Sequence, residues 1–198
     1  MQPIQLSEAD ALLVIDMQVD FLPGGKLGVP GGDAVLNPIN DLLALFSSRD
    51  LPIYASRDWH PENHCSFADR GGPWPPHCVA DTAGSAFSDR LALPASAVIV
   101  SKADTPDVDA YSAFNGTDLA AHLRGHGVRR VVVCGLATDY CVLNTVLDAR
   151  ENGFEVLIVE EAMRAVDVNP GDGERAIARM RAIGAQSAGV AQLLDTVK

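Results

Sequence analysis

Residues 131–152 read VVVCGLATDYCVLNTVLDAREN, and this stretch decides the fold. Its first part, residues 131–136, is a continuous apolar run rich in β-branched residues, which is typical of a strand buried on both faces. Residues 139–152 then follow a helical period, and Gly153 stands where that helix must turn into the next apolar run at 155–159. A strand, a helix and a second strand in this order predict a parallel β-α-β unit.

The same alternation extends over the rest of the chain. Apolar runs predict further strands at residues 11–15, 52–56, 97–101 and, shorter, 186–188, while segments of helical period predict helices at 35–48, 118–126, 174–183 and from Val190 onward. The pattern predicts a single α/β domain over residues 1–198. We expect a three-layer α/β/α fold in which the middle layer is a mainly parallel, six-stranded, Rossmann-like sheet.

Composition favours small-molecule chemistry. The 198 residues carry a formal net charge of −11, with 15 Lys and Arg against 26 Asp and Glu, so the chain lacks the concentrated basic patch that nucleic acids and anionic membranes require. No apolar run approaches the roughly 20 residues of a membrane-spanning helix, and the N-terminal apolar stretch ends in Asp16 instead of a small-residue cleavage site. We expect a cytoplasmic protein without nucleic-acid or membrane partners; a homo-oligomer is compatible with the sequence.

Residues 57–94 interrupt the alternation of strands and helices. They contain Pro, Gly, His, Asp and aromatic residues without a convincing regular element. Irregular stretches of this length inside a compact domain are usually functional. We therefore expect this segment to contribute to the functional site.

Reactive side chains follow four of the predicted strands. Asp16 follows the first, Asp58 the second, Lys102 the third and Cys141 the fourth. In an open parallel sheet the carboxyl ends of the strands meet at one edge, and ligands bind in the crevice beyond it. The sequence thus predicts that these four side chains gather at one site.

Cys141 is the candidate nucleophile. Thr138 is the predicted N-cap of the following helix, which would place Cys141 at the third helical position, where unpaired N–H groups and the helix dipole favour a thiolate. Asp16 can take the thiol proton, and Lys102 can hold the pair in its charged form. The alternatives are a buried apolar cysteine, which is what we expect of Cys134, and solvated or helix-capping charges for Asp16 and Lys102.

The irregular segment 57–94 carries candidate metal ligands. Asp58 and His60, two residues apart, and the later His77 offer the oxygen and imidazole ligands that suit zinc, iron or manganese and leave positions open for water or substrate. This donor set predicts a catalytic rather than a structural metal site. His64 has three open interpretations: a fourth ligand, a group hydrogen-bonded behind the ligands, or a loop cap.

The four cysteines are too few and too irregularly spaced for a disulfide framework. Cys65 and Cys78 raise the alternative of a structural zinc site. This alternative is the weaker one, because the chain has no C-x₂₋₄-C pair.

Five motifs in this order resemble one known family. They are IDMQVDF at 15–21, RDWHPENHCSF at 57–67, WPPHCV at 74–79, VSKA at 100–103 and GLATDYCV at 135–142. Each motif is weak alone, but the ordered set, which covers nearly the whole chain, resembles the nicotinamidase/pyrazinamidase family of the isochorismatase-like cysteine hydrolase superfamily. Ala103 stands where a glycine often follows the lysine, and Tyr140 is a position that the family varies.

The resemblance implies a hydrolase of a linear amide C–N bond. The expected reaction converts nicotinamide, and also pyrazinamide, to the acid and ammonia through a cysteine thioester in NAD salvage, with one divalent transition metal and no organic cofactor. It also implies a cis peptide between Leu136 and Ala137. The matching positions are Asp16, Lys102 and Cys141 for catalysis, the amides of Ala137 and Cys141 for the oxyanion hole, Asp58, His60 and His77 for the metal, and Phe21, Leu27, Trp74 and Tyr111 for the substrate pocket.

Two other functions compete with this interpretation. A relative acting on another amide, such as N-carbamoylsarcosine or maleamate, usually lacks the Asp-x-His and later His ligands, and isochorismatase itself lacks the cysteine. A non-catalytic nucleotide- or metal-binding module is disfavoured, because no G-x-G-x-x-G follows the first strand and no P-loop is present. The candidate pocket residues could also be ordinary core residues of a long loop.

Overall fold

The computed structural model describes residues 4–194. Its strands are β1 (Asp10–Ile15), β2 (Ile53–Asp58), β3 (Val98–Lys102), β4 (Arg130–Leu136), β5 (Glu155–Arg164) and β6 (Gln186–Ser187). Its α-helices are α1 (Leu36–Ser48), α2 (Leu119–Gly125), α3 (Leu143–Glu151), α4 (Asp172–Ala182) and α5 (Val190–Leu194). Short 3₁₀ turns at Val19–Phe21, Gly32–Val35, Ala68–Arg70 and Ala83–Ser85 punctuate the loops. None of the helices within residues 4–194 is long and apolar enough to cross a membrane.

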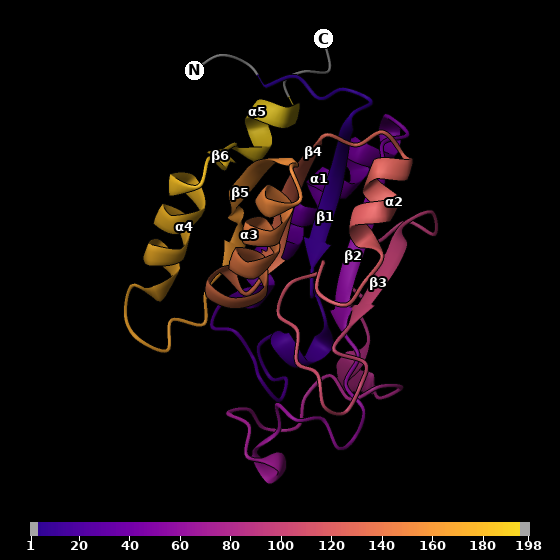
Figure 1. The fold of residues 1–198 in the computed structure, drawn as a ribbon. Helices are drawn as coiled ribbons and strands as arrows, with labels where there is room; N and C mark the ends of the chain where they lie inside the picture. The colour runs from indigo at the N-terminus through magenta and orange to yellow at the C-terminus, as the bar shows by residue number, and fades with distance from the viewer. Residues whose placement is uncertain (1–3, 195–198) are drawn as a thin grey trace.

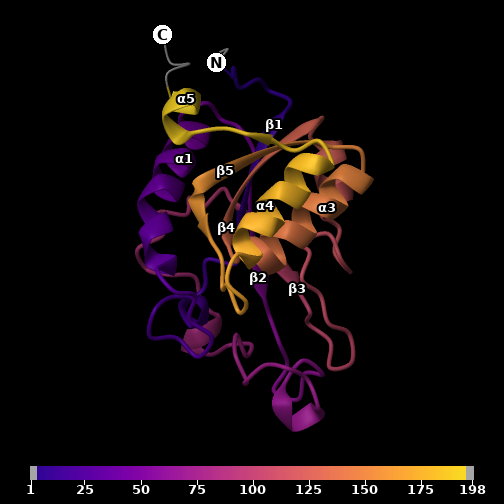
Figure 2. The same ribbon diagram turned by 90° about the vertical axis from the view of Figure 1, so that its left-hand side faces the viewer.

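The six strands form one sheet in the order β3-β2-β1-β4-β5-β6, and every pairing is parallel (Figure 1). Helices α1 and α5 cover one face, and α3 and α4 lie on the other (Figure 2). Each face of the sheet has its own apolar core, because alternate β1 residues such as Leu12 and Leu13 point to opposite sides. The predicted three-layer α/β/α fold is confirmed, and the sheet is wholly parallel in place of mainly parallel.

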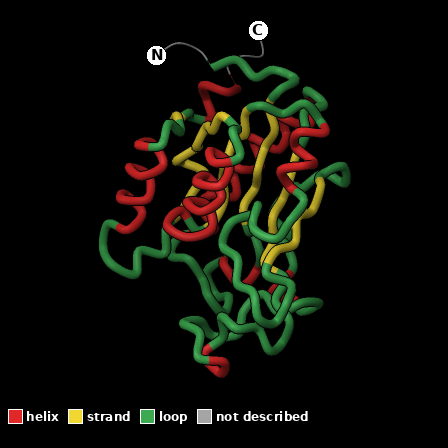
Figure 3. Tube along the Cα trace, in the orientation of Figure 1, coloured by secondary structure: helices red, strands yellow, loops and turns green. Residues whose placement is uncertain are grey.

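The strand order reverses between β1 and β4, which places a crevice at their carboxyl ends. Gly135, near the end of β4, has φ of 117°, and a Cβ atom there would lie 2.1 Å from the carbonyl oxygen of Ile15. Only glycine permits this close approach of the two strand ends. The loops gather beyond this edge of the sheet, where Figure 3 shows residues outside helices and strands concentrated.

Two local predictions were wrong. Strand β5 continues to Arg164, well beyond the predicted end at residue 159, because its pairing with β4 resumes at Met163 and Arg164 after a shift of register. The carboxylates of Glu160 and Glu161 reach the side chain of Arg181 and the backbone N–H of Val190. A polar pair in a strand thus marks a tertiary contact here and not a strand end.

Thr138 is not the N-cap of the helix that follows β4. Residues Thr138–Val142 form a π-helical turn that precedes α3, and Ala137 occupies the cap position without a side-chain cap. The carbonyl of Ala137 accepts hydrogen bonds from the N–H groups of Tyr140 and Val142, each at 3.1 Å. A single-turn π-helix often occurs at a functional site, and this one carries Cys141.

Candidate active site

Asp16, Lys102 and Cys141 come together at the carboxyl edge of the sheet. Asp16 directly follows β1, Lys102 ends β3, and Cys141 lies in the π turn after β4. The Lys102 Nζ atom lies 3.0 Å from Asp16 Oδ2 and 3.5 Å from Cys141 Sγ. Asp16 and Lys102 are at most 1% exposed, which excludes their interpretation as solvated loop charges.

Ser56 determines which oxygen of Asp16 faces the thiol. Its hydroxyl, from the neighbouring strand β2, donates a 2.7 Å hydrogen bond to Asp16 Oδ1. Asp16 Oδ2 is buried and pairs with the Lys102 ammonium at 3.0 Å, while an Asp16 carboxylate oxygen and Cys141 Sγ lie within 4.8 Å of each other. Because Ser56 engages Oδ1, we assign Oδ2 as the oxygen that takes a proton from Cys141. Ser56 was not among the predicted site residues, although its position two residues before Asp58 was a usable signal.

Burial controls the protonation of the nucleophile. It raises the pKa of the Cys141 thiol well above its usual value, and the Asp16 and Asp58 carboxylates add to this while Lys102 opposes it. This direction is opposite to the thiolate-favouring effect expected of a helix N-terminus, because burial and two adjacent carboxylates outweigh the nearby cation. Cys141 therefore depends on a neighbouring group, such as Asp16, to accept its proton during the reaction.

The two carboxyl groups beside Lys102, those of Asp16 and Asp58, have pKa values shifted in opposite directions. Burial raises the pKa of Asp16, and Lys102 only partly opposes this shift. Burial also disfavours the Asp58 carboxylate, but Lys102 and His60 outweigh this effect and hold the pKa of Asp58 below its usual range. For Lys102, burial lowers the pKa, but the two carboxylates raise it well above its ordinary value. Asp58 therefore stays anionic, and Asp16 is the more basic carboxylate of the pair.

Asp58, His60 and His77 form the group with metal-ligand spacing. Their ligand atoms all lie within 4.8 Å of one another, and all three side chains are buried. His60 Nδ1 lies 3.2 Å from the carbonyl oxygen of Ala103, and His77 Nδ1 lies 2.8 Å from that of Pro75. Each carbonyl accepts an Nδ1–H donor, which leaves each Nε2 as a lone-pair ligand. One carboxylate and two such imidazoles fit a divalent transition metal.

His64 lies beside this group without joining it. Its ring stacks on that of His60 with the centroids 4.2 Å apart. Its Nδ1 hydrogen-bonds to Ser66 and its Nε2 to the carbonyl of Val108, so both ring nitrogens already have partners. Among the described residues, the groups with metal-ligand spacing contain neither His64 nor Cys65. His64 thus hydrogen-bonds to loop groups and contacts the ligand His60 through ring stacking.

Gln18 fixes the backbone of Asp58, a role that sequence analysis missed. Its fully buried amide donates to the carbonyls of Asp58 at 2.8 Å and Ser85 at 2.9 Å, and its oxygen accepts from the N–H of Asp58 at 2.8 Å. Asp20 acts similarly two residues later, because its Oδ2 accepts a 2.8 Å hydrogen bond from the N–H of Cys78, next to His77. The signal was present as polar residues inside the IDMQVDF motif.

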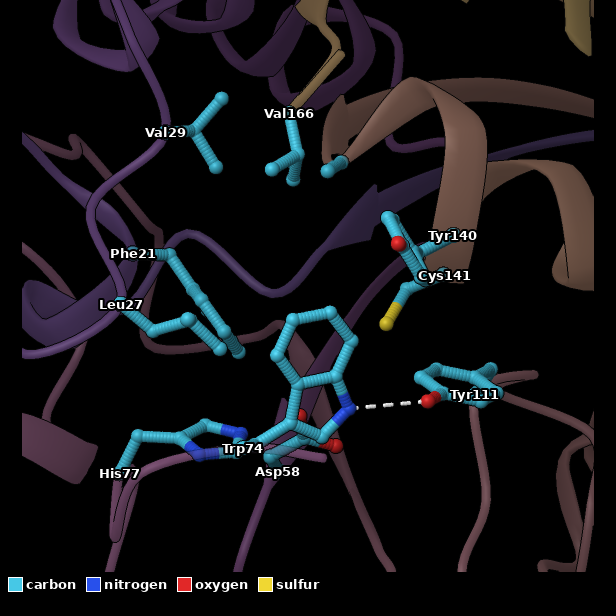
Figure 4. Close-up of a pocket in the computed structure, with 11 residues that line it drawn as sticks. Phe21, Leu27, Val29, Asp58, Trp74, His77, Tyr111, Tyr140, Cys141 and Val166 are labelled. Carbon is cyan, nitrogen blue, oxygen red and sulfur yellow. Dashed lines mark hydrogen bonds between the residues drawn. The ribbon is translucent and has the colours of Figure 1, made fainter. Parts of the chain in front are cut away.

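A narrow cavity opens onto Cys141. The four predicted pocket residues Phe21, Leu27, Trp74 and Tyr111 all line it, together with Val29, Asp58, His77, Ala137, Tyr140 and Val166. Figure 4 shows the Cys141 sulfur and Tyr140 across the space from Phe21 and Leu27. The indole N–H of Trp74 donates a 3.0 Å hydrogen bond to the hydroxyl of Tyr111 (Figure 4). A mostly apolar space with a few polar groups suits a small flat molecule.

Asp139 ties one wall of this cavity to the turn that carries Cys141. Its two carboxylate oxygens accept hydrogen bonds from the N–H groups of Val166 and Asp167, each at 2.9 Å. Val166 thereby faces the cavity from the loop after β5. Val166 was not among the predicted site residues because it is far from every motif in the sequence, and the tertiary contact with Asp139 brings it to the cavity.

Ala137 and Cys141, whose amides the resemblance implies as an oxyanion hole, both line the cavity. The peptide between Leu136 and Ala137 is cis, as the resemblance implies. Ala103, directly after Lys102, has φ of 51°. This left-handed conformation explains physically why glycine suits the position, since it carries no Cβ penalty there.

The isochorismatase domain family matches residues 10–192. The chain belongs to the isochorismatase family. Among its relatives, the nicotinamidase of Escherichia coli strain K12 is 40% identical over 196 residues, which cover 88% of this chain and 92% of that protein. The pyrazinamidase of Pyrococcus horikoshii, solved in complex with zinc, is 50% identical with a TM-score of 0.88, over 91% of this chain and 99% of that one.

A second solved structure similar to this chain carries a ligand. It is PnC1 from L. infantum in complex with nicotinate, which is 40% identical with a TM-score of 0.88 and aligns over 97% of this chain and 98% of its own. The aligned region thus includes nearly the whole chain and not only the sheet.

Proposed function

We propose that this chain hydrolyses nicotinamide, and also pyrazinamide, to the carboxylic acid and ammonia through a thioester on Cys141. One observation carries the proposal: a single narrow cavity contains both the Cys141 thiol and, from the metal-ligand group, Asp58 and His77. Nicotinamide has a carboxamide and a ring nitrogen, and this cavity offers a group for each. The nicotinamidase and pyrazinamidase relatives support this choice of substrate.

The chemistry rests on the protein's own side chains. Asp16 Oδ2 accepts the proton of Cys141, whose sulfur attacks the carboxamide carbon while the amides of Ala137 and Cys141 bind the oxyanion. Asp16 then protonates the departing ammonia and afterwards takes a proton from the water that hydrolyses the thioester. Lys102, held between Asp16 and Asp58, keeps its charge and stabilises the anionic states of this cycle.

Asp58, His60 and His77 would hold one divalent metal, and we propose zinc, iron or manganese, with no organic cofactor. When bound, the metal supplies a Lewis acid for the pyridine nitrogen. Phe21, Trp74 and the remaining apolar lining would hold the faces of the ring, so that the carboxamide carbon lies against Cys141.

The competing function is hydrolysis of an amide that lacks a ring nitrogen. The deciding experiment compares kcat/KM for nicotinamide, pyrazinamide and benzamide in metal-loaded and chelated protein. We expect good turnover of the first two and poor turnover of benzamide, since a site built for a polar atom can reject an analogue lacking it by up to about 10⁴-fold. His77→Ala should erase most of this preference while Cys141 still reacts with iodoacetamide. Equal turnover of benzamide by the loaded enzyme would overturn the ring-nitrogen role.

We also propose that the whole chain, residues 1–198, acts as one hydrolase domain in the cytoplasm, where its product would enter NAD salvage. Segment 57–94 supplies the metal ligands in this arrangement. The salvage role is tested by the growth of a strain that depends on nicotinamide and carries the gene for either the wild-type chain or the Cys141→Ala chain. Growth that does not depend on Cys141 would argue against it.

A further inference from the structure

The ammonium of Lys102 occupies a position that a metal ion would fit. It lies 3.0 Å from Asp16 Oδ2, 3.5 Å from Cys141 Sγ and 3.3 Å from the carbonyl oxygen of Ala110, and it also contacts Asp58 Oδ1. Two carboxylates, a sulfur and a carbonyl around one buried cation form a ligand set that a divalent transition metal would accept.

Asp16, Asp58 and Cys141 have metal-ligand spacing in their own right. One ligand atom from each lies within 4.8 Å of the others, and all three side chains are buried. Asp16 Oδ2 is fully buried and pairs with the Lys102 ammonium at 3.0 Å. A buried carboxylate oxygen needs a cation or a hydrogen-bond donor as its neighbour, so removal of the ammonium would leave this oxygen open to a metal ion.

This second group adjoins the proposed metal site, because the two share Asp58. Asp58 Oδ1 contacts Lys102, while Oδ2 lies 3.6 Å from His60 Nε2. A thiolate is a strong ligand for zinc and other soft or borderline metals. A metal ion that enters the site of Asp58, His60 and His77 therefore passes close to a sulfur that could bind it, and a metal-bound sulfur would no longer be a free nucleophile.

We propose that Lys102 excludes a second metal ion from the group formed by Asp16, Asp58 and Cys141, and thereby keeps the thiol free beside a metal centre. This inference rests on the proposed metal site of Asp58, His60 and His77. The fixed cation neutralises the two carboxylates and fills the volume between them, so a divalent ion meets both a steric obstacle and a like charge. Lys102 thus protects the nucleophile in addition to stabilising it.

The test titrates the metal-free protein with Co²⁺ and follows its absorption. Wild-type protein should bind one equivalent without a thiolate-to-cobalt charge-transfer band in the near ultraviolet. Lys102→Ala should bind a second equivalent and show that band, as a sulfur–cobalt bond forms and the thiol proton passes to the buffer. Lys102→Ala combined with Cys141→Ala should lose the band, and Lys26→Ala, at an exposed lysine, should behave as wild type.

Labelling with iodoacetamide gives a second readout that does not require turnover. Zn²⁺ beyond the first equivalent should leave the labelling rate of Cys141 unchanged in wild-type protein. In Lys102→Ala it should slow labelling by about tenfold when free Zn²⁺ is about ten times its dissociation constant. Should Lys102→Ala fail to fold, Lys102→Leu keeps an apolar stem and leaves the cation out.

The outcomes separate the two proposals. Wild-type protein that binds no Co²⁺ at all contradicts the metal site itself. A wild-type protein that binds one equivalent, together with Lys102 variants that also bind only one and show no thiolate band, contradicts the role of Lys102 alone. Slower labelling of wild-type Cys141 by a second equivalent of Zn²⁺ also contradicts it, whether or not any variant folds.

Discussion

Replacement of Gln18 by methionine should destabilise the protein and weaken metal binding together. Methionine has nearly the volume of glutamine but cannot make the three buried hydrogen bonds by which Gln18 holds Asp58 and Ser85. The substitution therefore removes polar contacts without opening a large cavity. The Gln18 side chain contacts none of the reacting groups directly.

The expected magnitude follows from the three hydrogen bonds. A buried hydrogen bond contributes about 1 kcal/mol net, and a buried partner left unsatisfied costs about 1–3 kcal/mol. Gln18→Met leaves the N–H and carbonyl of Asp58 and the carbonyl of Ser85 without this partner. We expect the free energy of unfolding of metal-free protein to fall by at least about 3 kcal/mol. Loss of a group that orients a ligand should weaken metal affinity about 10- to 100-fold.

Urea unfolding of the chelated protein measures the first quantity, and competition with a chromophoric chelator measures the second. Asn40→Ala is the matched control, because Asn40 also spans two backbone groups, those of Arg90 and Ala92, but through exposed hydrogen bonds and without lining the cavity. Its cost should stay within about 1 kcal/mol, with metal affinity unchanged. Gln18→Met with wild-type metal affinity and a loss below about 1 kcal/mol would refute the positioning role.

Three further predictions concern the thiol and its base. Cys141→Ala should lower kcat by several orders of magnitude while the fold, measured by circular dichroism, persists. In wild-type protein, alkylation should select Cys141, which lines the cavity, over Cys134, which is fully buried inside β4. Nicotinamide should protect Cys141. Asp16→Asn should be nearly as inactive, and retention of more than about a tenth of wild-type kcat/KM, a loss of only about 1.4 kcal/mol, would show that Asp16 is not the base. Because the pKa of Asp16 is raised above 3.8, kcat/KM should fall as the pH drops through a value higher than 3.8, and this fall is the acid limb of the pH profile. Ser56→Ala removes a hydrogen bond that favours the Asp16 carboxylate, so it should move the acid limb to higher pH and lower kcat. Ser56→Thr should restore both the acid limb and kcat. An acid limb that does not move in Ser56→Ala would contradict the link between Ser56 and Asp16.

The local sequence determined the sheet and its reactive edge. Apolar runs such as residues 131–136 can only be buried on both faces, and the glycines after the helices allow the chain to return to the next strand. The positions of Asp16, Lys102 and Cys141 after predicted parallel strands were therefore enough to predict that they lie at one edge of the sheet. The pattern did not predict the end of β5, which depends on partners that are distant in sequence. It also did not predict the π turn at Thr138–Val142, which depends on unusual backbone geometry.

Pairwise contacts between elements were decided only by the tertiary structure. The sequence identified Asp16 and Asp58 as reactive, but their opposite pKa shifts arise from burial and from the position of Lys102 between them. Gln18 and Ser56 show the same limit, since a side chain that orients another residue has no signature of its own until the strands are paired. Residue types and spacing fix which chemistry is available, whereas distance and burial, which set electrostatic energies, exist only once the chain has folded.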